Sequence, residues 1–160
     1  MRDIEFRRAL GLYATGVAVV TAATDGGDHI GITVNSFSSV SLEPPLILFS
    51  ASKRLLSLDK LIQSDNWAVN VLGRDHVEHS RRFATAMGEK WNGIDVAYGI
   101  KGSPLLKEAI ATFECEPYAQ HDGGDHKIMV GRVLRFRGSE RAQPLIFFGG
   151  EYRQIQPAAQ

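Results

Sequence analysis

Short β-branched runs separated by turn signals are the feature that most restricts how this chain can fold. The first run, VAVVTAAT (Val17 to Thr24), ends at the turn sequence Asp25-Gly26-Gly27-Asp28, and IGITVNSF follows as its predicted hairpin partner. Five further runs follow: LILFS (46–50, after the Pro44-Pro45 break), WAVNVL (67–72), then 112–121, 127–136 and 145–152. Because most connections are short and regular βαβ crossovers are lacking, the pattern favours a mainly β, antiparallel barrel over a doubly wound sheet.

Helical spacing of apolar residues is confined to a few brief segments. It predicts an amphipathic helix over 4–13 and another helix with Leu58, Leu61 and Ile62 on one face. Asp75 and Glu78 form a capping-box-like start for a helix through Phe83. Ser103-Pro104 predicts a further helix start before LLKEAI, since proline is favoured at the first helical position. Helices are therefore expected at the periphery of the barrel.

Length and charge narrow the function classes. A chain of 160 residues fits one domain spanning 1–160, and its 18 basic side chains are balanced by 18 acidic ones, so neither nucleic acid nor a membrane is an expected partner. Cys115 is the only cysteine and alternates with Phe113, which predicts a buried strand residue rather than a nucleophile. With no disulfide, no signal-peptide pattern and no long apolar span, a cytoplasmic location is expected.

The segment from Thr33 to Ser39 places small polar side chains between two apolar strands. These residues are Thr33, Val34, Asn35, Ser36, Phe37, Ser38 and Ser39. A flavin ring suits such a segment, because one edge of the ring needs hydrogen-bond partners and the other needs apolar walls. A serine-rich turn that solvates its own backbone is the alternative that composition alone leaves open.

A second candidate segment follows the strand at 46–50. Ser50, Ser52, Lys53 and Arg54, with Ser57 shortly after, combine hydroxyls and cations at the start of a helix. Such a combination is typical of a phosphate site, so the phosphate end of a flavin is a candidate ligand. A solvated basic turn explains the same residues.

Two glycine-containing stretches near the C-terminus are the remaining candidates. Gly123-Gly124-Asp125 precedes His126 at a strand entrance, where the imidazole could contact an amide or ribose and act as a local proton source. His126 is therefore the candidate for the nicotinamide side, although a lone loop histidine is commonly structural. In PLIFFGGEY (144–152), Phe147 and Phe148 are interpreted as core residues.

Several other chemistries are not encoded. The chain has neither a G-x-G-x-x-G motif behind a strand nor a P-loop motif, so any nicotinamide cofactor must bind outside a Rossmann frame. His76 and His79 stand beside Glu78 at helical spacing, but no third metal ligand is evident. No metal site is therefore predicted.

Taken in order, the motifs resemble the flavin reductase-like family, the small reductase components of two-component monooxygenases. They are F-R-R-A-L, A-T-G-V-A-V-V-T, T-V-N-S-F-S-S-V-S-L-E-P-P-L, W-A-V-N-V-L, F-A at Phe83, G-S-P-L-L, C-E at Cys115, G-D-H at Gly124 and P-L-I-F-F-G-G-E-Y. The resemblance implies an FMN-binding split barrel of Greek-key topology, commonly homodimeric with flavin near the subunit interface. It also implies site residues: Thr33 through Ser39 at the isoalloxazine and ribityl chain, Ser52, Lys53 and Ser57 at the phosphate, Phe83 and Ala84 closing over the flavin, and His126 and Tyr152 at the nicotinamide.

The activity implied by the resemblance is hydride transfer from NADH or NADPH to N5 of FMN or FAD. The reduced flavin would then serve a partner monooxygenase. The chain departs from the family in two places: many relatives have Asp where Glu43 stands, and many have a longer Ser/Thr-rich turn than Ser52-Lys53-Arg54. The difference in the turn leaves the phosphate contacts open, and with them the choice between FMN and FAD. Two alternatives remain: a fixed flavin that reduces a corrinoid, a ferric complex or a quinone, and a flavin-binding or storage protein without turnover.

Overall fold

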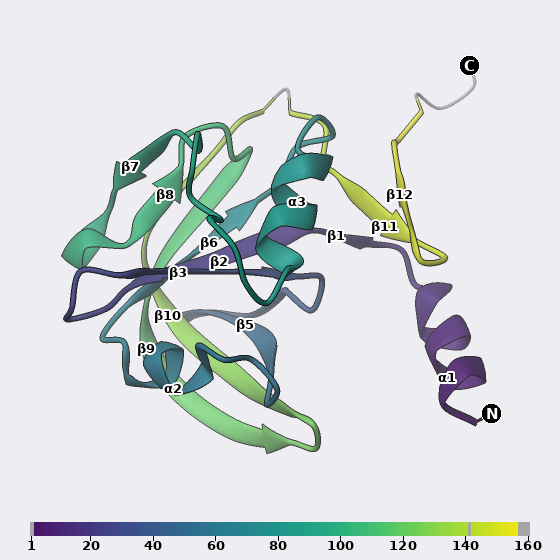
Figure 1. The fold of residues 1–160 in the computed structure, drawn as a ribbon, viewed down its shortest axis with the longest axis horizontal. Coiled ribbons are helices and arrows are strands. Elements are labelled where there is room, and N and C mark those ends of the chain that lie inside the picture. Colours follow the sequence, from purple (N-terminus) through teal and green to yellow (C-terminus); the bar gives the residue numbers. More distant parts are fainter. Residues whose placement is uncertain (1, 141, 157–160) are drawn as a thin grey trace.

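One antiparallel sheet of seven strands forms the body of the molecule. The computed structural model describes residues 2–140 and 142–156. The strand order in the sheet is β3-β2-β6-β9-β10-β5-β4, and every neighbouring pair is antiparallel. The strands are β2 (Ala18–Ala23), β3 (His29–Val34), β4 (Ser38–Leu42), β5 (Pro45–Ser52), β6 (Trp67–Val71), β9 (Ala111–Gly123) and β10 (His126–Gly138). Because consecutive strands β3 and β4 lie at opposite ends of this order, the sheet curls into a split Greek-key barrel (Figure 1).

Smaller elements surround the barrel. Two short sheets are formed by β1 (Thr15–Gly16), β11 (Ile146–Phe148) and β12 (Glu151–Arg153), and by β7 (Val96–Tyr98) with β8 (Pro104–Leu106). The helices are α1 (Arg2–Gly11), α2 (Leu58–Gln63), α3 (Val77–Ala84) and the single 3₁₀ turn η1 (Ile100–Gly102). None of the helices in the described part of the chain is long and apolar enough to cross a membrane.

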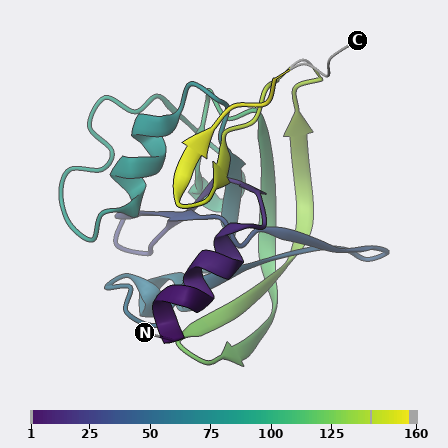
Figure 2. The same ribbon diagram turned by 90° about the vertical axis from the view of Figure 1, so that its right-hand side faces the viewer.

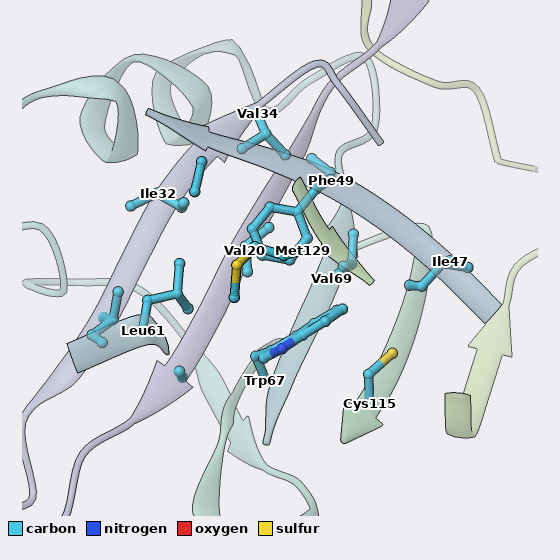
Figure 3. Packing of buried hydrophobic residues seen from close by; sticks show 14 residues of the cluster. Val20, Ile32, Val34, Ile47, Phe49, Leu61, Trp67, Val69, Cys115 and Met129 are labelled. Carbon is cyan, nitrogen blue, oxygen red and sulfur yellow. The ribbon is translucent and has the colours of Figure 1, made fainter. Parts of the chain in front are cut away.

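The barrel interior is filled by β-branched and aromatic side chains. Phe49 meets Trp67 edge-on with ring centroids 4.9 Å apart, and both side chains are fully buried (Figure 3). A Cβ on Gly131 would stand only 2.3 Å from the nearest indole atom of Trp67. Glycine at this position therefore allows β10 to pass close over the ring. Cys115 belongs to this core, as its strand pattern predicts.

A second apolar cluster outside the barrel fixes α3. Val17, Val19, Leu72, Leu106 and Leu145 are buried around Phe83, which projects from the last turn of α3. The predicted start of this helix is wrong in detail: His76 is the N-cap residue and makes no side-chain capping bond, and its Nδ1 instead accepts a hydrogen bond from the Gly73 amide at 3.0 Å. The cluster positions the C-terminal end of α3 over β3.

Two further local expectations are wrong. The segment after Ser103 is not a helix but strand β8, because Pro104 O accepts the Thr21 hydroxyl and the Leu106 amide donates to Asn70 Oδ1 at 2.9 Å. These side chains from β2 and β6 satisfy the backbone groups that a helix would have paired internally. Phe148 is 38% exposed rather than a core residue, whereas Phe147 packs on the second cluster.

The serine-rich run continues into a strand that the sequence did not predict. Ser38–Leu42 forms β4, which pairs with β5 in a hairpin projecting from the barrel (Figure 2). Polar side chains alternate with Val40 and Leu42 along it, so its sequence reads as an edge strand only when its partner is known.

Candidate functional site

A cavity of about 520 Å³ opens at one side of the barrel between β3, the turn from β5 into α2, and the end of α3. The segment that follows α3 covers its remaining side. Five of the residues expected at the flavin line this cavity: Thr33, Ser52, Ser57, Phe83 and Ala84. They come from three separate stretches of sequence, so the fold brings together the phosphate cradle, one end of the Thr33–Ser39 run and the F-A motif.

The cavity wall is rich in cations. Arg54, Lys60 and Lys90 all line it, and Asp28 is the one carboxylate among the lining residues. Lys60 Nζ is 3.4 Å from Asp28 Oδ2, so this acid offsets one cation and leaves a positive excess. Such a wall favours an anionic group.

Glycine at position 31 makes the floor of the cavity. A Cβ there would lie 2.4 Å from the ring atoms Cδ1 and Cε1 of Phe83, which is itself buried. Because Gly31 has no side chain, the Phe83 ring packs directly on β3. Beside it, the Thr33 hydroxyl donates to the Ser80 carbonyl oxygen at 2.7 Å, which ties β3 to α3.

The segment after α3 is held over the cavity by Trp91. Its indole Nε1 donates to the His29 carbonyl oxygen at 3.2 Å, and its ring meets Phe83 with centroids 4.9 Å apart. Lys90 Nζ donates to the Gly31 carbonyl oxygen at 3.3 Å, and its partial burial lowers the pKa of the ammonium group. Lys90 and Trp91 therefore form the wall of the cavity that is attached to β3.

The remainder of the Thr33–Ser39 run lies elsewhere. Val34 is buried in the core, and Ser38 and Ser39 are exposed on β4. Ser36 and Ser50 bind each other: the Ser50 amide donates to Ser36 Oγ at 2.9 Å, and that hydroxyl lies 3.2 Å from the Ser50 carbonyl oxygen. Asn35 and Phe37 line a separate small cavity of about 50 Å³ next to Val71. The structure thus brings one end of the run, at Thr33, to the large cavity.

Lys53, the cation expected at the phosphate, points away from the large cavity. Its ammonium group pairs with Asp122 on β9, and Lys53 is absent from the cavity lining. The adjacent Arg54 lines the cavity instead, and its amide donates to Ser52 Oγ at 3.2 Å. A phosphate role for Lys53 stays a prediction that this geometry does not favour.

The two residues predicted to contact the nicotinamide, His126 and Tyr152, lie in different parts of the molecule. His126 begins β10 directly opposite Ser52 of β5, and its Nδ1 lies 2.7 Å from Asp125 Oδ1. It therefore stands near the rim of the cavity, while Tyr152 packs behind α3 against Phe147 with ring centroids 5.6 Å apart. The guanidinium of Arg81 lies over the Tyr152 ring at 5.8 Å.

His76, the N-cap residue of α3, and His79 within α3 share Glu108 as acidic neighbour rather than Glu78, which stands beside them in the sequence. Glu108 Oε2 is 3.5 Å from His76 Nε2 and 3.9 Å from His79 Nε2. Burial, and then the neighbouring His76, lowers the pKa of His79. In residues 2–140 and 142–156, no group of three or more His, Cys, Asp or Glu side chains is arranged to hold a metal ion.

Sequence reasoning missed Gly31, Lys60, Lys90 and Trp91 as site residues. The last two follow Gly88 in a segment without strand or helix periodicity, where a cation beside a tryptophan is the one available signal. That signal is weak because it does not say which surface the segment covers.

Comparisons with known proteins agree on one family. The model described as "Flavin reductase like domain" matches residues 10–156. The chain is 44% identical over 147 residues to the FMN reductase (NADH) SmoA of Agrobacterium fabrum, covering 92% of this chain and 83% of that protein. It is 37% identical to the flavin-dependent monooxygenase reductase subunit HsaB of Rhodococcus jostii, covering 95% and 77%. The structure of the NADH:FAD oxidoreductase SgcE6 of Streptomyces globisporus with NAD and FAD fragments superposes with a TM-score of 0.93 at 33% identity, covering 99% and 95%.

Proposed function

The chain belongs to the flavin reductase-like domain family and is an NAD(P)H-dependent flavin reductase; from this premise we propose that it releases reduced flavin to a separate monooxygenase component. Relatives named as reductase subunits of such systems, HsaB among them, support this role. If this proposal is correct, the protein reduces many molecules of free flavin in succession rather than one permanently bound molecule.

The cavity beside β3 carries the proposal. It combines hydroxyl groups at Ser52 and Ser57, an apolar floor at Phe83, and the cations Arg54 and Lys90. A flavin nucleotide needs this combination, because it joins an aromatic ring to a polyhydroxyl chain that ends in phosphate. A volume of about 520 Å³ lies within the usual range for pockets that bind ligands of this size. We place the phosphate end in this cavity and the ring toward Ser36 and Ser50.

The residues act by positioning rather than by acid–base chemistry. When bound, the flavin accepts at N5 the hydride that leaves C4 of the nicotinamide. The chain must therefore hold two rings in contact, which the rim between Ser50 and His126 can do from neighbouring strands β5 and β10. The His126 imidazole, held by Asp125, is a hydrogen-bond partner for the amide or ribose of the nicotinamide nucleotide.

A second copy of the chain is the proposed partner of the apolar surface around α1. Ile4, Phe6, Leu10, Leu12 and Tyr13 are 57–79% exposed, and α1 stands at one side of the molecule beside the β11–β12 hairpin (Figure 1). Surfaces of this kind commonly mark subunit interfaces. We expect light scattering to give the mass of a dimer for the wild type and of a monomer for Phe6→Glu/Leu10→Glu. The charge change Asp59→Arg on α2 is the control.

One anaerobic experiment tests the catalytic role. Purified protein is mixed with NADH and a large excess of free FMN or FAD, and absorbance is followed at the nicotinamide and flavin bands. Many turnovers that bleach the free flavin support the reductase. A single stoichiometric turnover would instead indicate a fixed flavin that serves another acceptor. Binding without any bleaching would indicate a storage protein.

A further inference from the structure

A second cavity, of about 390 Å³, lies next to the large one and is lined mainly by polar side chains. Its walls are the turn between β2 and β3, the end of α2 with the residues that follow it, and Lys101 of η1. Asp28 and Lys60 line both cavities, so their ion pair forms the partition between the two. Both side chains are more than half exposed, and an exposed pair of this kind is weak. One ligand can therefore occupy both cavities by displacing Asp28 from Lys60.

The two cavities differ in charge. The large cavity has a positive excess, whereas the second has three carboxylates, Asp25, Asp28 and Asp65, and two ammonium groups, Lys60 and Lys101. Asp28 pairs with Lys60, and Asp65 pairs with Lys101 at 3.7 Å. Among residues 2–140 and 142–156, no ion pair of Asp25 occurs. The second cavity therefore repels phosphate and suits an uncharged group that donates hydrogen bonds.

Asn66 supplies a buried acceptor to the second cavity. Its side chain is 4% exposed, and its Nδ2 donates to the Ile100 carbonyl oxygen, which fixes the orientation of the amide. In the described part of the chain, no hydrogen bond to Asn66 Oδ1 occurs, although the residue lines the cavity. Buried amide oxygens normally have a partner, because an unmade hydrogen bond costs free energy. Asn66 Oδ1 is therefore a position for a donor from a ligand.

Adenosine has the donors that this cavity lacks. The amino group of adenine donates to an amide oxygen, and ribose hydroxyls donate to a carboxylate. Asn66 supplies the amide oxygen and Asp25 the unpaired carboxylate. Lys60, at the partition, stands where a diphosphate would join such a nucleoside to a group in the large cavity.

We propose that the second cavity binds the adenosine half of FAD, so that FAD is held more tightly than FMN. This inference rests on the proposed function. Family membership does not decide between the two flavins, because SmoA is named an FMN reductase and SgcE6 an NADH:FAD oxidoreductase. On binding, Asn66 Oδ1 accepts from adenine, Asp25 accepts from the ribose, and Lys60 exchanges Asp28 for the diphosphate. The adenosine of NADH has the same chemistry, so the experiment must separate the two sources.

The test compares dissociation constants for FAD and FMN, measured by calorimetry at constant ionic strength. Asn66→Ala removes the amide oxygen, Asp25→Asn removes the unpaired charge from an exposed turn, and Asp59→Asn is the control because Asp59 lies outside both cavities. We expect Asn66→Ala to weaken FAD by about tenfold and Asp25→Asn by about threefold, as the loss of one hydrogen bond or of its charge predicts. The FMN affinity should stay within about twofold in every variant, since FMN lacks the adenosine. Free adenosine should compete with FAD and leave the FMN affinity unchanged.

Several results would overturn the assignment. One is a wild type that binds FAD no more tightly than FMN, and another is equal weakening of both flavins in Asp25→Asn. Unchanged FAD affinity in both variants would also overturn it. If the KM for NADH, measured with FMN as acceptor, rises at the same time, the cavity holds the adenosine of the nicotinamide nucleotide instead. Failure of the wild type to bind any flavin would overturn the proposed function as well, which distinguishes that failure from the others. Thermal unfolding verifies that each variant is folded, and Asp25→Asn carries the test if Asn66→Ala is not.

Discussion

The hydroxyl oxygen of Tyr152 lies 2.8 Å from the hydroxyl oxygen of Ser80. Ser80 is buried on α3, and its carbonyl oxygen accepts the Thr33 hydroxyl from β3. The C-terminal hairpin is therefore linked through one helical residue to the wall of the large cavity. Since the Tyr152 hydroxyl already pairs with Ser80, the predicted contact with a nicotinamide would have to use the Tyr152 ring.

Replacing Tyr152 by Phe should separate these two roles. Loss of the hydroxyl leaves the buried Ser80 side chain without this partner, and we expect the free energy of unfolding to fall by about 1 kcal/mol in urea titrations. The KM for NADH should stay within about twofold, because the ring remains. Tyr152→Ala should raise that KM. An equal rise in both variants would show that the hydroxyl, not the ring, contacts the nucleotide.

Adding a methyl group at Gly31 should damage the cavity floor. The new Cβ would stand 2.4 Å from the Phe83 ring and 3.1 Å from Trp91, so both rings must move. We expect Gly31→Ala to lower the free energy of unfolding by about 1–3 kcal/mol and to weaken FMN binding. Gly26→Ala is the control, because the nearest atom to its Cβ is 3.9 Å away. Normal flavin affinity in Gly31→Ala would contradict the assigned floor.

The buried carboxylate of Glu114 should contribute to stability against acid. Burial alone would raise its pKa, but the hydrogen bonds from Arg135 and from the Ile100 amide outweigh burial and lower it. A lowered folded-state pKa stabilises the fold above the unfolded value of about 4.3, and this contribution is lost as pH falls through the folded value.

Urea unfolding of wild type and Glu114→Gln between pH 7 and pH 3 measures this contribution. The wild type should be more stable by about 1.5–3 kcal/mol near neutrality, and the difference should shrink below about pH 4. A difference that does not change with pH would mean that charge on Glu114 is not what stabilises the fold.

Removing the imidazole of His126 should impair binding of the nicotinamide nucleotide or its reaction, and should leave the affinity for flavin unchanged. Its place opposite Ser52 puts it at the cavity rim, outside the set of residues that line the cavity. We expect His126→Ala to raise the KM for NADH severalfold or to slow flavin reduction in stopped-flow traces. His121→Ala, on the neighbouring strand β9, is the matched control. Kinetics identical to wild type would remove His126 from the site.

The thiol of Cys115 should be unreactive in the native protein. Burial, and then the negative charge of Glu114, raises its pKa to about 12, so almost no thiolate forms at neutral pH. Maleimide labelling followed by mass spectrometry should give no adduct in buffer at pH 7.5 and one adduct in concentrated urea. Rapid labelling of folded protein would contradict the buried position on β9.

Local pattern was sufficient for most of the barrel, because strand-forming runs and turn signals act over a few residues. The strands 18–23, 67–71 and 126–138 follow directly from their β-branched sequences. Local pattern failed at Pro104–Leu106, where Thr21 and Asn70 satisfy a backbone that propensity alone predicts to be helical. It also missed β4, whose strand state depends on pairing with β5.

The sequence by itself determined the fold class, the family and the types of residue at the site, since these depend on order and spacing along the chain. Only the tertiary structure decided which cation faces the cavity. Asp122 is 69 residues from Lys53 and takes its charge away from the site. Gly31 and Trp91 are far apart in sequence, yet together they place Lys90 on the cavity wall. Charge partners and close packing are set by contacts between distant segments, and no local motif records them.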